Sequence, residues 1–219
     1  VIYILLTLFL LASCQKEEYV GTPRGMGTLV LETLSVQTEN VNTVFTRAVE
    51  PDLYVEIWQN GQLLTGQRYE PGKVPGKLDL PAGVYLLKTY NQAYQDMSGW
   101  LDTEKGNMAF SAEKDFEIES NEINYLSVEV PMVNIGVSLK LPEGFSDRFK
   151  DYHFTVQVGN RSVEISNGET AYFPLSEVTY ILSATNNDGE NKTKSKTIKS
   201  PVAGTIYAVS YTHLTLPTT

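Results

Sequence analysis

Apolar and polar residues alternate along almost the whole chain, and this pattern constrains the fold more than any other feature of the sequence. In the clearest run, Ile135, Val137, Leu139 and Leu141 alternate with small or polar residues. Successive side chains of a β-strand point to opposite faces, so a period of two predicts strands that are half buried against a core. No window has the i, i+3, i+4, i+7 apolar spacing of an amphipathic helix. We therefore predict an all-β protein.

Turn-forming residues separate the predicted strands. Gly159-Asn160 lies between two alternating runs and predicts a hairpin with a primed turn. Similar signals recur at short intervals, as is typical of β-sandwiches: Asn60-Gly61, Pro71-Gly72, Pro75-Gly76, Pro81-Ala82-Gly83 and Asn187-Asp188-Gly189. A second series of strands begins after Pro131. We expect two tandem antiparallel β-sandwich domains, at residues 25–131 and 132–208.

The first thirteen residues form an apolar run that ends in small residues before the single cysteine. A helix that spans a membrane needs about 20 apolar residues, and this run is shorter, so residues 1–13 are predicted to be a signal peptide. Leu11, Ala12 and Ser13 before Cys14 resemble a bacterial lipobox, in which the peptide is cleaved before an acylated cysteine. Two or three acyl chains would hold the mature chain on a membrane.

Residues 14–24 are then expected to be a lipidated tether. It begins with Gln15, Lys16, Glu17 and Glu18, which resemble the export signal that Bacteroidota place after a lipidated cysteine. We interpret the chain as an outer-membrane lipoprotein that faces the cell exterior, with a periplasm-facing lipoprotein as the alternative. Because the sequence has one cysteine, the mature fold is expected to depend on packing without a disulfide.

The C-terminal residues 209–219 look like the translation of a sequencing adapter, so we leave them out of the fold prediction. On this interpretation the natural protein continues beyond Ala208, and the second domain is truncated in this sequence.

The composition excludes some partners and reactions. A net charge of −9 argues against nucleic acid, because phosphates are bound by basic residues. The histidines are His153 and His213, and the one cysteine is the lipidation candidate, so a thiol nucleophile, a Cys/His metal site or a Ser-His-Asp triad is not expected. The Asn- and Asp-rich stretch 186–191 lacks the spacing of a calcium loop and is interpreted as a hairpin. We predict no enzymatic activity, no metal and no cofactor.

Two aromatic groups are candidate ligand contacts. Tyr54 and Trp58 lie on the face of a predicted strand opposite Val55 and Ile57. If the aliphatic pair points inward, an exposed aromatic pair remains, and such pairs often mark binding sites. Aromatic platforms with polar fringes suit glycans.

The second group lies in residues 91–100, a stretch without strand periodicity that contains Tyr94 and Trp100. Loops on a rigid sandwich often carry function, so this pair is also a candidate glycan contact. The alternative is that Trp100 plugs the end of a sandwich.

Several stretches, taken in order after the lipobox, resemble Bacteroidota lipoproteins of the domain-of-unknown-function family four-four-nine-three. They are residues 27–31, 46–48, 55–57, 78–85, 116–118, 134–137 and 151–154. Proteins of that kind are similar to fimbrial subunits, anchors and tip proteins built from two transthyretin-like or Ig-like β-sandwiches. The resemblance therefore implies a structural or adhesive role at the cell surface, and it transfers no catalytic residue.

The resemblance also implies a processing site, because related fimbrial subunits mature by cleavage after an arginine that frees a groove for a partner's strand. Arg47 follows the first predicted strand and is the candidate, with an ordinary exposed loop arginine as the alternative. The expected partners are the membrane, through the lipid, and other fimbria-like subunits. The second functional hypothesis is a glycan-binding lipoprotein that captures polysaccharide for an outer-membrane uptake system.

Overall fold

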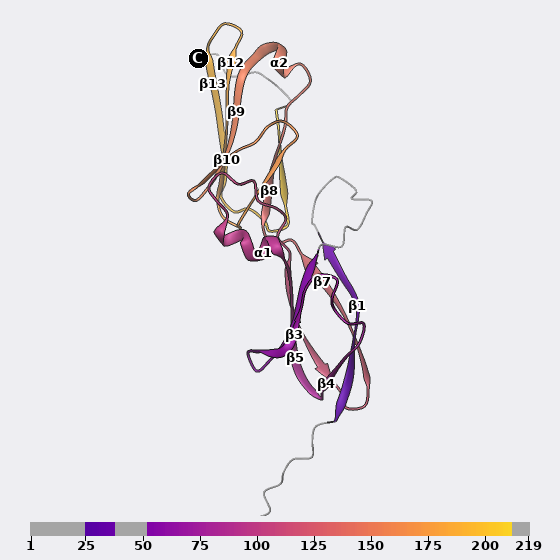
Figure 1. Cartoon of the computed structure of the whole chain (residues 1–219). Helices are drawn as coiled ribbons and strands as arrows, with labels where there is room; N and C mark the ends of the chain where they lie inside the picture. The colour runs from indigo at the N-terminus through magenta and orange to yellow at the C-terminus, as the bar shows by residue number, and fades with distance from the viewer. Residues whose placement is uncertain (1–24, 38–51, 212–219) are drawn as a thin grey trace, which may run out of the picture.

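The computed structural model describes residues 25–37 and 52–211. Figure 1 shows two β-sandwiches arranged end to end, which we call sandwich 1 (strands β1 to β7) and sandwich 2 (strands β8 to β14). The prediction of an all-β fold with two tandem sandwiches is confirmed. The Gly159-Asn160 hairpin is confirmed too, since Arg161 pairs with Val158 across that turn.

The described residues of sandwich 1 form strands with two short helices between the fifth and the sixth. The elements are β1 Met26–Gln37, β2 Leu53–Gln59, β3 Gln62–Tyr69, β4 Leu78–Pro81, β5 Gly83–Asn91, α1 Gln92–Asp96, the 3-10 helix η1 Met97–Gly99, β6 Ser111–Ile118 and β7 Ile123–Pro131.

Sandwich 2 follows after the short connection 132–134. Its elements are β8 Ile135–Lys140, α2 Phe145–Arg148, β9 Phe149–Val158, β10 Arg161–Glu164, β11 Thr170–Phe173, β12 Val178–Asn186, β13 Asn191–Ile198 and β14 Ile206–Ser210.

The two sandwiches have the same topology. The sheets of sandwich 1 have the strand orders β4-β1-β7 and β3-β2-β5-β6, and those of sandwich 2 have the orders β11-β8-β14 and β10-β9-β12-β13. Adding seven to each strand number of sandwich 1 gives sandwich 2. Strands β5 and β12 are also alike in sequence, since Tyr85, Leu87 and Asn91 correspond to Tyr180, Leu182 and Asn186. The chain therefore contains the same strand topology twice.

One strand pair in each sandwich is parallel, whereas the other named pairs are antiparallel. β1 pairs in parallel with β7, and β8 pairs in parallel with β14. Parallel neighbours need a long connection between them, and here the rest of each sandwich supplies it, because the first and last strands of the domain lie side by side. Alternation along a strand carries no information about this pairing.

The predicted strand faces form two separate cores. Sandwich 1 buries Leu29, Val55, Ile57 and Leu87 among others, and sandwich 2 buries a second set that includes Phe154. Each of these side chains is at most 1% exposed. Burial of a large aliphatic side chain contributes roughly 1.5–3 kcal/mol, so the inward positions of the alternation stabilise both sandwiches without a disulfide.

The end of the described chain takes part in sandwich 2. Val209 and Ser210 lie in β14 and pair with Leu139 and Lys140. Val209 is 7% exposed and Tyr211 is 9% exposed. Residues 209–211, which the sequence analysis left out of the fold, therefore complete a strand and part of the core, whereas residues 212–219 lie outside the described residues.

Candidate ligand-binding surfaces

The outer face of the β3-β2-β5-β6 sheet carries an aromatic surface. Val55 and Ile57 are 0% exposed and point into the core. Neighbouring residues of a strand face opposite ways, so Tyr54, Glu56 and Trp58 lie together on the outer face. Tyr54 and Trp58 are both half-buried there. The condition that the sequence analysis set for an outward aromatic pair is met.

Three tyrosines on this face form a row of rings, which we call the tyrosine cluster. Tyr54 on β2 is paired with Tyr90 on β5, and their ring centroids are 5.5 Å apart with an interplanar angle of 20°. Tyr94 on α1 extends the row, with its centroid 6.0 Å from that of Tyr90. The side chain of Asn91 caps α1 by accepting a hydrogen bond from the Tyr94 amide, which fixes the start of this helix beside the sheet.

A buried carboxylate joins the tyrosine cluster to Trp58. Glu56 is 7% exposed although it lies on the outer face. The Tyr90 hydroxyl donates to Glu56 Oε1 at 2.6 Å, and Trp58 Nε1 donates to Glu56 Oε2 at 2.9 Å. Arg68 Nε lies 3.5 Å from Glu56 Oε1. Buried charges are normally paired and hydrogen-bonded, and Glu56 meets both conditions.

The environment of the tyrosine cluster changes the ionisation of Tyr90. Burial and then the hydrogen bond to the Glu56 carboxylate raise the pKa of Tyr90 to about 12. Both causes favour the neutral phenol, because ionisation would place a negative charge in a desolvated site beside a carboxylate. Tyr90 therefore remains a hydrogen-bond donor to Glu56 over the physiological pH range.

Two cations lie over the aromatic rings. Lys88 Nζ is 4.6 Å from the Trp58 ring centroid and 2.8 Å from Glu113 Oε1. The Arg68 guanidinium carbon is 5.9 Å from the Tyr54 centroid. These contacts hold the rings in place, and the charges of Glu113, Lys88, Glu56 and Arg68 cancel across the sheet. The surface around the rings is thus aromatic and polar.

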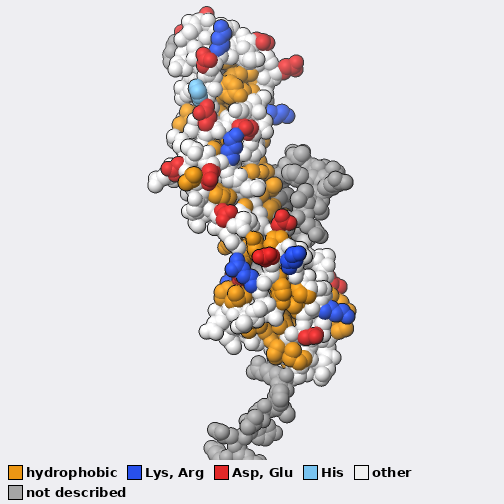
Figure 2. Space-filling view, viewed as in Figure 1, with side chains coloured by type: hydrophobic (Ala, Val, Ile, Leu, Met, Phe, Trp, Pro, Cys, Tyr) orange, Lys and Arg blue, Asp and Glu red, His pale blue; other side chains and the backbone are white. Residues whose placement is uncertain are grey.

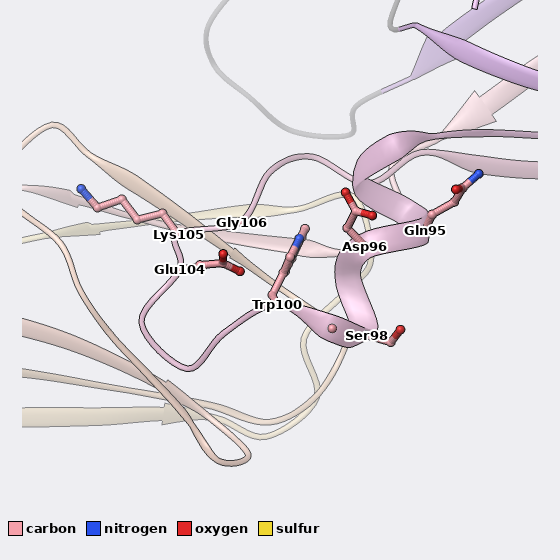
Figure 3. A pocket seen from close by; sticks show the side chains of 8 residues that line it. Gln95, Asp96, Ser98, Trp100, Glu104, Lys105 and Gly106 are labelled. Carbon is pink, nitrogen blue, oxygen red and sulfur yellow. The ribbon is translucent and has the colours of Figure 1, made fainter. Parts of the chain in front are cut away.

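Trp100 lies elsewhere, in the long β5–β6 connection at the junction of the sandwiches. A Cβ added to Gly106 would come within 2.7 Å of the Trp100 ring, so the loop folds tightly against the indole. The indole lies at an open hollow of about 740 Å³. Figure 3 shows the side chains that line this hollow. The hollow is lined by Gln95, Asp96, Ser98, Gly99, Trp100, Glu104, Lys105 and Gly106.

Arg161, the first residue of β10, connects this loop to sandwich 2. Its guanidinium lies 5.2 Å from the Trp100 centroid and donates hydrogen bonds to the carbonyl oxygens of Leu101 (3.3 Å), Tyr172 (3.0 Å) and Glu104. Burial lowers the pKa of Arg161 from its usual value. A cation satisfied by main-chain oxygens of both sandwiches stabilises their junction.

The same loop covers two edge strands of sandwich 2. The Ser162 amide of β10 donates to the Asp102 carbonyl at 3.1 Å, and the Tyr172 amide of β11 donates to the Lys105 carbonyl at 2.6 Å. Edge strands present unpaired backbone groups that attract other chains. Loop 101–106 therefore closes one side of sandwich 2, and Trp100 has structural contacts as well as a place beside the hollow.

The structure thus regroups the four candidate ligand contacts. Tyr54, Trp58 and Tyr94 belong to one face, whereas Trp100 belongs to the junction. Sequence reasoning missed Tyr90 and Glu56, which complete the face. Tyr90 could have been found, because the alternation of β5 places it outward when Leu87 points inward.

Other predicted site residues lie outside the described residues. These are Leu11, Ala12, Ser13, Cys14, Gln15, Lys16, Glu17, Glu18 and Arg47. Within the described part of the chain, no helix is long and apolar enough to cross a membrane, and no group of three or more His, Cys, Asp or Glu side chains could hold a metal ion.

These features define a class of protein, a tandem β-sandwich with an aromatic outer face on its first domain. The family model described as "Domain of unknown function (DUF4493)" matches residues 25–217, and the chain belongs to that family. The resemblance stated from the sequence is therefore confirmed. No curated protein matches the sequence.

Solved structures with a similar fold come from bacteria. A "putative cell adhesion protein" of Bacteroides eggerthii is 10% identical with a TM-score of 0.46, and the match covers 87% of each chain. A "putative cell adhesion protein" of Bacteroides ovatus is 14% identical with a TM-score of 0.45, and the match covers 85% of this chain and 93% of that one. The Bacillus anthracis TIE protein is 13% identical with a TM-score of 0.33, and the match covers 85% of this chain but only 33% of that chain.

Proposed function

We propose that this chain is a non-enzymatic lipoprotein, anchored through Cys14 in the outer membrane, displayed on the cell surface, and structural or adhesive in the manner of fimbrial anchor or accessory subunits. It uses no cofactor and no nucleic-acid partner. The observation that carries the proposal is the place of β1 in the tandem-sandwich fold. The strand nearest the membrane tether is also a central strand of a sheet.

β1 lies between β4 and β7 and hydrogen-bonds to both. Leu29 of β1 is 1% exposed, so this strand fills part of the core of sandwich 1. Removal of β1 would uncover backbone groups on both neighbours and an apolar slot between them. A partner strand could occupy that slot by strand addition, with main-chain hydrogen bonds for affinity and alternate side chains for specificity. Cleavage after Arg47 is the proposed step that would free β1.

The anchor is tested by Cys14→Ala in the full chain, produced in a Bacteroidota host. We expect the parent chain in the membrane fraction and digested by protease added to intact cells, and the variant released from the membrane. A variant that stays membrane-bound, or a parent chain shielded from protease, would contradict the proposal.

Strand release is tested with an arginine-specific protease. The parent chain should be cut after Arg47 and then bind a peptide with the sequence of residues 26–37, whereas the uncut chain should not. Arg47→Gln should block both events, and Arg68→Gln should block neither. Binding of the peptide to the uncut chain would count against the mechanism.

The aromatic face of sandwich 1 supports a second function, capture of glycans. Tyrosine and tryptophan rings beside fixed polar groups offer both the stacking and the hydrogen bonding that sugars use. The ion pairs beside the rings, Arg68 with Glu56 and Lys88 with Glu113, balance each other and suit an uncharged polysaccharide. Tyr54, Trp58 and Tyr94 are the proposed contacts, with Trp100 contributing a separate surface at the hollow.

A panel of purified polysaccharides tests this function. Tyr54→Ala and Trp58→Ala should weaken binding, whereas Ile181→Ala, on the corresponding face of sandwich 2, should leave it unchanged. Trp100→Ala separates the hollow from the sheet face. Absence of binding to the whole panel by a folded chain would leave the structural role alone.

A further inference from the structure

The two sandwiches differ sharply in charge although they share a topology. Among the described residues, sandwich 1 carries fourteen acidic and six basic side chains, whereas sandwich 2 carries eight of each. The excess negative charge of the described chain thus belongs to sandwich 1. Sandwich 2 gathers three of its basic side chains on a single edge strand, β13.

The basic side chains of β13 form a row. Lys192, Lys194 and Lys196 pair with Ala184, Leu182 and Tyr180 of β12, which are buried, so the lysines share the side of β13 that continues the core-facing side of β12. β13 is the edge of its sheet, and Lys194 and Lys196 are exposed. Residues two apart on a strand are about 6.8 Å apart, which gives a regular spacing of charge.

The acidic counterpart lies on β6, the strand with the same position in sandwich 1. Glu113, Asp115 and Glu117 pair with Lys88, Leu86 and Val84 of β5, so they share the outer face. All three acidic residues are exposed, and β6 is the edge of its sheet. The acidic row therefore has the same number of charges and the same spacing as the lysine row.

We propose that the lysine row of β13 binds the acidic row of β6 on a second copy of this chain. The contact extends the structural role proposed above by naming a partner, and it does not depend on the lipid anchor or on strand release. Two different surfaces meet in it, so a pair of copies keeps one free lysine row and one free acidic row. Such head-to-tail contacts build open chains when the rotation between copies does not close a ring.

Existing ion pairs leave charge available for this contact. Lys192 lies 2.9 Å from Glu190, and Glu113 lies 2.8 Å from Lys88. Among the described residues, Lys194, Lys196, Asp115 and Glu117 make no ion pair. Lys194 contacts the Tyr211 ring instead, at 5.6 Å.

Lysines on an edge strand oppose indiscriminate pairing with other sheets, because an apolar strand cannot neutralise them. A row of carboxylates with matched spacing can neutralise the lysines, so a partner that carries such a row can bind. The same chain supplies that row at the corresponding edge, which favours a second copy over an unrelated polyanion. Charge complementarity of this kind contributes mainly to specificity and to the association rate.

Sedimentation velocity on the chain from residue 15, which keeps both sandwiches whole, tests the proposal. The parent chain should self-associate at low salt and dissociate at about 1 M salt, where the Debye length is roughly 3 Å. The basic-to-acidic variant K192E/K194E/K196E and the acidic-to-basic variant E113K/D115K/E117K should each self-associate at least about tenfold more weakly. A mixture of the two variants should associate again, because each supplies the row that the other lacks.

The matched control, K73E/K77E/K150E, makes the same charge change at two positions of the β3–β4 connection and one of β9, and should associate like the parent chain. Unfolding midpoints would show that every variant folds. A monomeric parent chain at low salt, equal loss in the control, or a mixture that stays monomeric would overturn the proposal. So would lysine-dependent binding of polygalacturonate by a chain that does not self-associate. None of these outcomes bears on surface display, which the Cys14→Ala variant tests separately.

Discussion

The outer faces of the two four-stranded sheets differ although the sheets have the same topology. In sandwich 1, the outer side of β5 carries Leu86, Lys88 and Tyr90, and Tyr90 belongs to the tyrosine cluster. In sandwich 2, the outer side of the β12–β13 hairpin is joined by hydroxyl contacts such as Thr179 to Thr197, at 2.8 Å. In Figure 2, hydrophobic side chains and side chains of both charges are visible over both sandwiches.

This difference shows which positions the fold fixes and which it leaves free. Inward residues of β5 and β12 agree where packing demands it, as at Leu87 and Leu182. Outward residues meet no such demand, so they can diverge, toward an aromatic surface in one sandwich and toward a hydroxyl-rich surface in the other. The outer face of sandwich 2 is therefore a control surface for every experiment on sandwich 1.

The largest expected effect is in the two cores, where we predict equal losses of stability for corresponding substitutions. Leu87→Ala and Leu182→Ala each remove a large buried side chain, and each should lower the free energy of unfolding by about 2–5 kcal/mol. Denaturant unfolding of the two variants measures this. A loss in one sandwich alone would show that the repeated topology does not bring repeated packing.

The next effect is at the junction, where the sandwiches depend on each other. Arg161→Ala removes three hydrogen bonds to carbonyl oxygens and should lower the free energy of unfolding by about 3 kcal/mol, since charge-assisted bonds are the stronger ones. It should also separate one unfolding transition into two. Calorimetry with Arg148→Ala, an exposed arginine of α2, is the control. An unchanged single transition in Arg161→Ala would rule out this coupling.

A smaller effect comes from exchanging an outer-face residue between the sandwiches. Tyr90→Thr gives β5 the residue that β12 has as Thr185, and it removes the ring stack and the hydrogen bond to Glu56. We expect a loss of about 1–2 kcal/mol, because Glu56 is left with fewer partners. Ser183→Ala should cost less than about 0.5 kcal/mol. Equal costs in chemical denaturation would show that the aromatic face adds nothing to stability.

A stabilising change is expected inside sandwich 1. The Thr89 side chain is 0% exposed, and its hydroxyl has no hydrogen-bond partner among the described residues. Thr89→Val keeps the shape and removes the hydroxyl, so it should raise the free energy of unfolding by about 1 kcal/mol. Ala184, at the corresponding position of β12, already lacks a hydroxyl. Destabilisation by this valine would mean that the hydroxyl is satisfied.

The subtlest prediction concerns alkaline pH, where each sandwich has a tyrosine whose pKa is strongly raised. The pKa of Tyr90 and that of Tyr211 are both raised to about 12, mainly by burial. A folded-state pKa above the unfolded value of 10 contributes stability that is complete below pH 10 and is lost as the pH rises toward 12. Absorbance titration should show two tyrosines that ionise near pH 12, and Tyr90→Phe and Tyr211→Phe should each remove one of them. Titration of every tyrosine near pH 10 would contradict both assignments.

Much of the fold could be predicted from the sequence. Alternation predicted the strands, and turn pairs such as Gly159-Asn160 predicted hairpins, because both signals are local. The parallel pairing of β1 with β7 could not be predicted, since it joins residues about a hundred positions apart and no local pattern encodes it. Residues 209–211 were set aside because of their sequence, yet they pack in sandwich 2.

The candidate site was also predictable only in part from the sequence. Tyr54 and Trp58 were predicted to share a face because one strand carries both of them. Their association with Tyr90, Tyr94 and Glu56 depends on the register between β2 and β5 and on the cap of α1, and only the tertiary structure decided it. Separation of Trp100 from that face was likewise decided by the β5–β6 loop crossing to sandwich 2.

The sequence by itself determined the strand periodicity, the residues that share a face of each strand, and the resemblance to the family to which the chain belongs. Tertiary structure decided that the two sandwiches share one strand topology. It also decided that loop 101–106 of the first sandwich covers two edge strands of the second. It also decided that the acidic and lysine rows occupy corresponding edges. The physical reason is that side-chain alternation follows from backbone geometry within one strand, whereas pairing and docking depend on contacts between distant segments, whose free energy no single segment contains.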